Sequence, residues 1–174
     1  MPDWHEAVQE SALSINPKNR SLRRDMIKHD FPITVTASGF QDNDWSQNPY
    51  LSMDEWASAS ASTRQHAVMM LDGGQEVERL RSFLADITAV EIYFETAHDG
   101  RGVSLAKRLI EMGFSGQIRG AGALHVDQFP HAIQCGISAL NLSREAALRM
   151  PEAYWIETAA SVHKADSYQA RLGL

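Results

Sequence analysis

The sequence predicts an α/β fold of roughly four parallel βα units, arranged as an open doubly wound sheet or as half of a (β/α)8 barrel. From residue 66 onward, short apolar runs alternate with segments of helical periodicity, as in βαβ construction. The apolar runs are continuous, which is typical of parallel strands that are buried on both faces. The 174 residues are enough for one hydrophobic core and a less regular N-terminal arm.

The chain divides at about residue 65 into this arm and an α/β core. Residues 1–65 show weak periodicity, although residues 31–40 alternate like a half-buried strand or a hairpin arm. A capping-box pattern predicts a short helix over residues 3–15. We therefore expect residues 1–65 to form an arm and a helix that pack on a core domain of residues 66–174.

The predicted elements follow in order from the end of the arm into the core. Ser52 and Glu55 form a second capping box, which opens a helix through residue 65. Right-handed crossovers then bring the C-terminal ends of all strands to one edge, where ligands gather in such folds. Strands are predicted at residues 67–71, 89–95, 117–123 and 139–142, and helices at residues 76–87, 103–114, 127–136 and 143–150.

Composition excludes several classes of protein. The formal net charge of −6 and the pI near 5.6 argue against a nucleic-acid surface, which needs clustered cations. The chain has no apolar run of membrane-spanning length, and its first residues carry acids where a signal peptide is basic, so we expect a cytoplasmic protein without a membrane partner. Cys135 is the single cysteine, so this chain alone cannot ligate an iron–sulfur cluster through its thiolates.

The turn after residues 89–95 carries the clearest candidate site. There, Gly100 and Gly102 flank Arg101 just before a predicted helix. Glycines let the backbone approach a ligand closely, and N–H groups at a helix start favour an anion. Arg101 adds a two-pronged donor for carboxylate, phosphate or sulfur oxyanions. The equally weighted alternative is a tight turn in which Arg101 pairs with Asp99 or Glu95.

Arg119 lies inside a predicted strand, where an arginine needs a partner. One interpretation is that it points to the same edge as Arg101, so that two arginines converge on an anion. The other, which we weight somewhat more, is a salt bridge to Asp86 or Glu91.

A second group of polar residues follows this strand. His131 and Cys135 lie one helical turn apart, which is compatible with a metal or an activated thiolate, but one such pair falls short of a structural zinc ligand set. We therefore predict no metal site from His125, Asp127, His131 and Cys135. The glycines of residues 120–122 do not form G-x-G-x-x-G, because His125 stands at the third glycine, and this excludes a standard nucleotide fingerprint.

Three motifs occur in a fixed order: DGRGVSLA at residues 99–106, GQIRGAG at 116–122 and DQFPHAIQCG at 127–136. In this order and spacing they resemble the bacterial domain-of-unknown-function 934 family, over residues 66–142 with a weaker echo near the C-terminus. Members are described as oxidoreductases of sulfite reduction. The resemblance thus implies an oxidoreductase or accessory protein of sulfite reduction and sulfur assimilation, with sulfite reductase components as partners.

Together, the residues and the resemblance define a ligand edge for a small anion. In this hypothesis Arg101 and Arg119 hold the anion, Asp127 and Gln128 orient it, and Asp99 fixes the turn. The catalytic candidates are Asp99, Arg101 and Asp127. The ligand-binding candidates are Gly100, Gly102, Ser104, Arg119, Gly122 and Gln128.

The sequence also departs from the family pattern at this edge. The family places a proline and a lysine where Glu95 and Thr96 stand, and an aspartate where Ala123 stands. These changes leave open whether the chain shares the family's chemistry or is a divergent member that only binds.

Whether the chain is an enzyme is left open, as is whether it binds a flavin or another cofactor. Multi-electron reduction of sulfite needs electron carriers, and a chain with a single cysteine cannot assemble them by itself. We therefore favour an accessory protein. The alternative is a non-catalytic module that docks on a reductase or forms a homodimer through an exposed sheet edge. A generic barrel-type enzyme is a third hypothesis, based on analogy alone.

Overall fold

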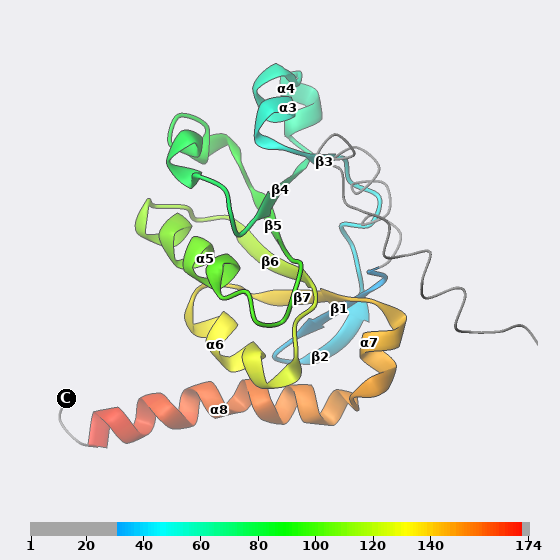
Figure 1. Ribbon diagram of the computed structural model, residues 1–174, viewed down its shortest axis with the longest axis vertical. Coiled ribbons are helices and arrows are strands. Elements are labelled where there is room, and N and C mark those ends of the chain that lie inside the picture. The colour runs from blue at the N-terminus through cyan, green and yellow to red at the C-terminus, as the bar shows by residue number, and fades with distance from the viewer. Residues whose placement is uncertain (1–30, 172–174) are drawn as a thin grey trace, which may run out of the picture.

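The computed structural model describes the backbone of residues 31–171 and the side chains of residues 31–162. These residues form one seven-stranded sheet with helices packed on it, which confirms the α/β class (Figure 1). The helix expected at residues 3–15 lies outside the described residues. The strands are β1 (Ile33–Thr36), β2 (Gly39–Asp42), β3 (Tyr50–Leu51), β4 (Val68–Asp72), β5 (Ala89–Phe94), β6 (Gln117–Gly122) and β7 (Ala139–Leu142).

The strand order in the sheet is β2-β1-β7-β6-β5-β4-β3. Strands β3 to β7 are parallel and follow the order of the sequence, without the reversal that a doubly wound sheet requires. The hairpin β1–β2 pairs antiparallel beside β7, so the sheet is mixed. Three of the seven strands, β1 to β3, therefore come from residues that the sequence assigned to the arm.

The observed helices differ from those predicted from the sequence at three main places, one in the predicted arm and two in the core. The helix predicted from the capping box of Ser52 and Glu55 does begin there, but it ends at Ser58, and Ser60 caps a second helix. Residues 76–87 form two short 3-10 helices, since apolar residues recurring every three positions fit 3-10 turns equally well. The third difference is a long C-terminal helix that the periodicity did not predict.

The helices are α3 (Met53–Ser58), α4 (Ala61–Arg64), η2 (Val77–Leu80), η3 (Leu84–Asp86), α5 (Arg101–Glu111), η4 (Val126–Gln128), α6 (Phe129–Gln134), α7 (Arg144–Arg149) and α8 (Glu152–Arg171). Helix α8 runs beside α6, and Phe129 of α6 meets Trp155 of α8 edge-on with ring centroids 5.7 Å apart. Within residues 31–171, no helix is both long enough and apolar enough to cross a membrane.

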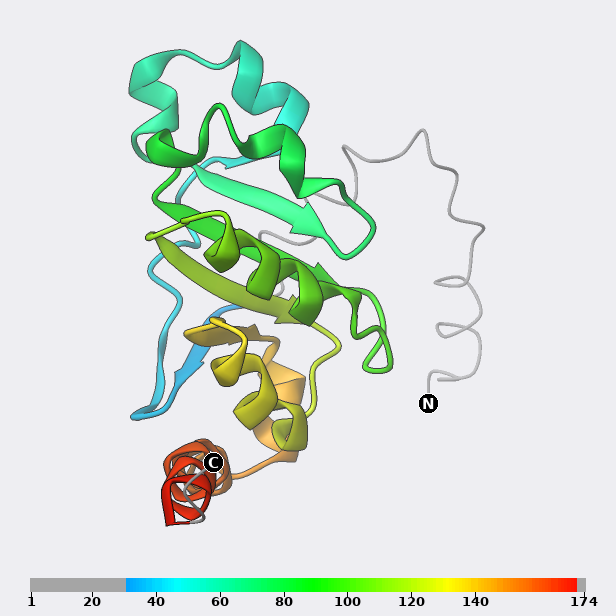
Figure 2. The same cartoon turned by 90° about the vertical axis from the view of Figure 1, so that its left-hand side faces the viewer.

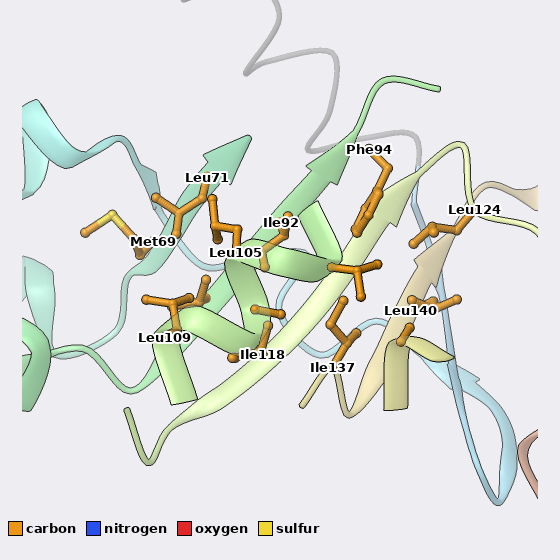
Figure 3. Close-up of a cluster of buried hydrophobic side chains, with 14 of the residues drawn as sticks. Met69, Leu71, Ile92, Phe94, Leu105, Leu109, Ile118, Leu124, Ile137 and Leu140 are labelled. Atoms are coloured by element: carbon orange, nitrogen blue, oxygen red, sulfur yellow. The ribbon is translucent and has the colours of Figure 1, made fainter. Parts of the chain in front are cut away.

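The two faces of the sheet differ sharply in composition. Helix α5 lies across one face of the sheet (Figure 2). On this face Val90, Ile92 and Phe94 of β5 join the main apolar core, to which α5 contributes Leu105 and Leu109 (Figure 3). Burial of each such side chain contributes about 1.5–3 kcal/mol. The alternate positions of the strands point to the opposite face, where the buried residues include several polar ones.

A short connection crosses this second face. Strands β2 and β3 are consecutive in the sequence but form the two edges of the sheet, and residues 43–49 join them on the side away from α5 and α6 (Figure 1). Seven strands at about 4.8 Å spacing span roughly 29 Å, which the connection could reach only if almost fully extended. Because it contains turns, the sheet must curl toward it. We call residues 43–49 the strap and the face beneath it the concave face.

Candidate functional site

The Asp99-Gly-Arg-Gly turn opens α5, and its arginine is paired. Helix α5 begins at Arg101 with Gly100 as its N-cap. Asp99 Oδ1 accepts from Arg101 Nε at 2.8 Å and from its backbone N–H at 3.1 Å, while Oδ2 accepts from Nη2 at 2.7 Å. The side-chain hydrogen bonds of Arg101, with its backbone N–H, lower the pKa of Asp99 to about 2. The ion pair with Asp99 is thus formed, yet it leaves the Arg101 side chain 69% exposed.

The glycines around this turn have different roles. A Cβ on Gly102 would collide with the Phe94 ring, and a Cβ on Gly73, after β4, would press on Arg101 and on the backbone of Gly102. Gly100, by contrast, has no atom within 4 Å of such a Cβ. Gly73 therefore allows close packing of the loop after β4 against the start of α5, Gly102 allows close packing of α5 on β5, and Gly100 leaves open space there.

A surface cleft of about 780 Å3 runs along the face of α5 that carries Arg101. Arg101, Ser104 and Arg108 line it, because residues three and four apart share one side of a helix. Arg108 Nε donates to Glu78 Oε1 at 2.9 Å across the cleft. Exposed His131 of α6 also lines it. The cleft therefore combines two guanidinium groups, a hydroxyl and an imidazole, all of which can bind an oxyanion.

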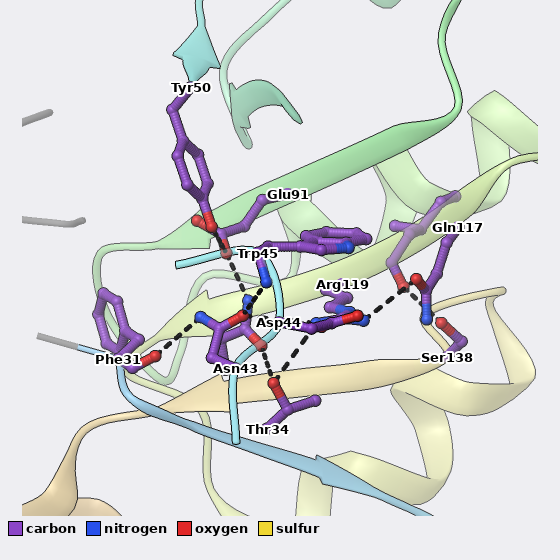
Figure 4. A network of polar contacts seen from close by, with 12 residues as sticks. Phe31, Thr34, Asn43, Asp44, Trp45, Tyr50, Glu91, Gln117, Arg119 and Ser138 are labelled. Carbon is purple, nitrogen blue, oxygen red and sulfur yellow. Dashed lines mark hydrogen bonds and ion pairs between the residues drawn. The ribbon is translucent and has the colours of Figure 1, made fainter. Parts of the chain in front are cut away.

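Arg119 does not join this cleft. It lies in β6 and points to the concave face, where only 2% of its side chain is exposed. Its Nη1 donates to Asp44 Oδ1 of the strap at 2.6 Å, and its Nη2 donates to Gln117 Oε1 at 3.2 Å (Figure 4). Arg119 therefore forms its salt bridge with Asp44, and the predicted partners, Asp86 and Glu91, were wrong. The structure does not bring Arg101 and Arg119 together.

The remaining predicted residues lie along the loop after β6. Gly122 has a φ of +101°, and a Cβ there would collide with the carbonyl oxygen of Phe94, so glycine is required. Gln128 Nε2 donates to the carbonyl oxygen of Ala97, which ties this loop to the one that carries Asp99. Asp127 is exposed. Gln128 and Gly122 thus hold the strand edge together, while neither Gln128 nor Asp127 lines the cleft beside α5.

The three positions at which the resemblance implied other residues, Glu95, Thr96 and Ala123, are neighbours in space. Phe94 pairs with Gly122 in the sheet, and Ala123 N–H donates to the carbonyl oxygen of Phe94 at 2.9 Å. Glu95, Thr96 and Ala123 consequently follow adjoining strand ends, and all three are exposed.

The concave face contains a buried polar network that the sequence analysis did not single out. Glu91 of β5 is 1% exposed, and its Oε2 accepts from Asn141 Nδ2 at 2.6 Å and from Tyr50 Oη at 3.4 Å. Burial raises the pKa of Glu91 to about 7, against the opposing hydrogen bonds of Asn141 and Tyr50 and the charge of Arg119. The signal for this network was an acid and an amide within two otherwise apolar strand runs, AVEIYF and ALNL.

Two polar atoms in this network have no hydrogen-bond partner among the described residues. They are Oε1 of Glu91 and Nε of Arg119, which belong to residues paired across β5 and β6. Trp45 of the strap covers the Arg119 guanidinium, with 3.8 Å from its carbon to the ring centroid. The strap thus covers one hydrogen-bond acceptor and one hydrogen-bond donor that have no partner among the described residues.

Potential metal ligands do not gather in the described part of the chain. No three His, Cys, Asp or Glu side chains there lie close enough to hold a metal ion. Cys135 is half-buried at the end of α6, packed against the main core.

Comparison with models of protein families gives a match over a large part of the chain. A family model described as "Bacterial protein of unknown function (DUF934)" covers residues 68–171, which is more than half of the chain. No curated protein matches the sequence. The matched region includes both the cleft beside α5 and the strands that carry Glu91 and Arg119.

Proposed function

Because the chain belongs to the bacterial DUF934 family, we propose its function from the cleft beside α5: the protein binds a small sulfur oxyanion there and serves sulfite reduction as an accessory protein. The observation that carries this proposal is the placement of Arg101, Ser104 and Arg108 along one cleft. Arg101 stands at the start of an 11-residue helix, where partial positive charge adds to that of the guanidinium group.

The carboxylates that bind the two arginines of the cleft indicate how an oxyanion would enter. Asp99 already presents two oxygens to Arg101, and Glu78 presents one to Arg108. A sulfite ion offers oxygens of similar geometry, so it would take the place of Asp99 on Arg101 or bind beside it. The ligand must therefore compete with an exposed ion pair, whose own contribution is small in water.

The test is calorimetric titration of the intact protein with sulfite, with sulfate as the comparison anion. Arg101→Ala should weaken sulfite binding by roughly tenfold or more, the effect of a lost charged hydrogen bond. Arg79→Ala is the matched control, because Arg79 is an exposed arginine that pairs with Asp54 and does not line the cleft. Absence of sulfite binding to the wild-type protein, or equal loss in both variants, would refute the proposal.

A visible absorption spectrum separates an accessory protein from a self-sufficient oxidoreductase. The protein is purified, mixed with flavin and freed of excess. A retained chromophore would favour a redox enzyme that holds its own cofactor. A colourless protein that still binds sulfite would favour the accessory role.

We also assign the finer architecture as half of a (β/α)8 barrel. The sequential order of β3 to β7 and the curling implied by the short strap support this assignment. In barrels of this kind, loops after the strands carry function, and Asp99 and Arg101 stand in such a loop and at the helix start that follows it.

The second candidate function is a docking module without catalysis. It is favoured by exposed apolar side chains on the last two helices: Leu148 is 87% exposed, Tyr154 47% and Ile156 37%. Light scattering and pull-down with sulfite reductase components test it. A monomer that captures no reductase would count against this candidate.

A further inference from the structure

Three consecutive residues of the strap contact one buried side chain of the sheet, in addition to the backbone hydrogen bonds of Asn43 and Pro49 at the two ends of the strap. Arg119 donates to Asp44 at 2.6 Å and to Asn43 Oδ1 at 3.5 Å, and its guanidinium stacks on Trp45. All three partners belong to the strap, whereas Arg119 belongs to the centre of the sheet. The position of Arg119 therefore affects how firmly the middle of the strap covers the concave face.

A second acid competes for this arginine. Glu91 is paired with Arg119 across adjacent strands, and the two side chains carry the unpartnered acceptor and donor of the network, Oε1 and Nε. Asp44 is 66% exposed and is solvated whether or not it is paired. An ionised Glu91 is buried and needs a compensating positive charge, so Arg119 stabilises an ionised Glu91 more than it stabilises the exposed Asp44.

The charged and titratable groups around Glu91 come from several elements. Tyr50 of β3 donates to it, and the charge of Arg119 of β6 acts on it. Asn141 of β7 adds a neutral donor. The strap contributes Asp44, which contacts Arg119. The pKa of Tyr50 is itself raised, by burial and then by the charge of Glu91, so Tyr50 remains a neutral donor throughout the neutral range.

We propose that the strap is a pH-sensitive latch over the concave face, held closed while Glu91 carries a proton and released as Glu91 ionises. Ionisation draws Arg119 toward Glu91 Oε1 and away from Asp44, and opening of the strap hydrates the new carboxylate. Release exposes Arg119 and Asn141 to solvent and so gives access to the concave face. This device is independent of anion binding in the cleft beside α5.

The direction of the pH effect follows from linkage. In the closed state the pKa of Glu91 is about 7, above the ordinary value of 4.5 that a hydrated Glu91 would have. The closed strap is therefore most favoured below pH 4.5, and this advantage is lost as pH rises toward 7. Because only the proton of Glu91 is released on opening, the equilibrium constant for opening of the strap can rise by at most about tenfold per pH unit across this window.

Hydrogen exchange of the intact chain, corrected for the intrinsic effect of pH, measures this opening. The reporters are the hydrogen-bonded backbone amides of Asn43, Trp45, Ser46 and Asn48. In the wild-type protein their protection should fall by roughly tenfold or more between pH 5 and 7 and level off above it. Amides in the middle of α5 serve as the internal reference and should keep constant protection.

Three variants separate the latch from general loosening. Glu91→Gln should abolish the pH dependence of strap protection. Asp44→Asn should lower strap protection at every pH. Tyr50→Phe removes a hydrogen bond that lowers the pKa of Glu91, so the fall in protection should extend to higher pH.

A wild-type strap whose protection does not change between pH 5 and 7 would overturn the proposal. An unchanged pH dependence in Glu91→Gln would also do so. If Glu91→Gln does not fold, the Tyr50→Phe profile decides, because a latch governed by Glu91 must shift with it.

Discussion

The guanidinium carbon of Arg119 lies 3.8 Å from the centroid of the Trp45 ring, so a cation from the middle of the sheet is covered by an aromatic residue of the strap. A cation held over an indole face is stabilised by the electrons of the ring, more strongly when water is excluded. Here Arg119 is 2% exposed and Trp45 is 6% exposed. This contact fixes the strap, which connects the edge strands β2 and β3, to the central strand β6.

Loss of the buried cation should be costly to the fold. Arg119→Met should reduce the free energy of unfolding by about 3 kcal/mol, because it breaks a buried ion pair and leaves Glu91 without its compensating charge. The measurement is urea unfolding at pH 7. Asp44→Asn keeps an amide oxygen that can accept from Arg119, and Glu91 can still ionise to balance the buried cation, so the cost should be only about 1 kcal/mol. Equal losses in the two variants would contradict the asymmetry.

The stability of the whole protein should depend on the proton of Glu91. The pKa of Glu91 is about 7 in the folded protein against an ordinary 4.5, so its contribution is fully present below pH 4.5 and is lost as pH rises to about 7. That difference corresponds to about 3 kcal/mol. Glu91→Gln should therefore gain up to about 3 kcal/mol relative to wild type between pH 4.5 and 8.

Urea unfolding of both proteins at several pH values checks this prediction. If the free energies of unfolding of wild type and Glu91→Gln change in parallel with pH, Glu91 ionises in the folded state without a loss of stability, and the prediction is wrong. Asp99 does not confound the window, because its pKa is lowered to about 2.

Gly122 should be irreplaceable where Gly100 is not. Gly122 has a φ of +101° and no room for a Cβ beside the carbonyl oxygen of Phe94. Gly122→Ala should lower the free energy of unfolding by about 2 kcal/mol or more, because both strain and a clash are introduced. Gly100→Ala is the matched control, since its φ is −70° and its surroundings are open. Thermal unfolding of the two variants distinguishes them, and similar melting temperatures would contradict the account.

Asp99 should act as a competitor of the anion in the cleft. Its carboxylate takes two of the side-chain donors of Arg101, so Asp99→Asn should release them and strengthen sulfite binding. The measurement is the same calorimetric titration that tests Arg101→Ala. Weaker binding in Asp99→Asn would instead mean that Asp99 holds Arg101 in position for the ligand.

The sequence predicted the core of the fold because its signals are local. The apolar runs that became β4 to β7 and the glycine after α5 depend on neighbouring residues alone. Residues 76–87 were assigned to one helix because their apolar spacing also fits 3-10 turns. Helix α8 was missed because it has no strong apolar face.

The sites were harder to predict because they depend on contacts between distant residues. The sequence identified the Asp99 to Arg101 turn and its possible ion pair, which form locally. It could not give the partner of Arg119, because Asp44 is 75 residues away and reaches it only through the strap. Glu91 could have been noted as an acid in an apolar strand, but its contacts with Tyr50 and Asn141 require the complete sheet.

The most direct test of the proposed oxyanion site is a sulfite titration of the intact, 15N-labelled protein, followed by the chemical shifts of its backbone amides. We predict saturable shifts for Arg101, Gly102 and Ser104 at the start of α5, with residues 43–49 of the strap unchanged at constant pH. Arg101→Ala should suppress these shifts, and Arg79→Ala should not. Absence of saturable shifts at α5, or shifts confined to another part of the molecule, would contradict the assignment of the cleft as the oxyanion site.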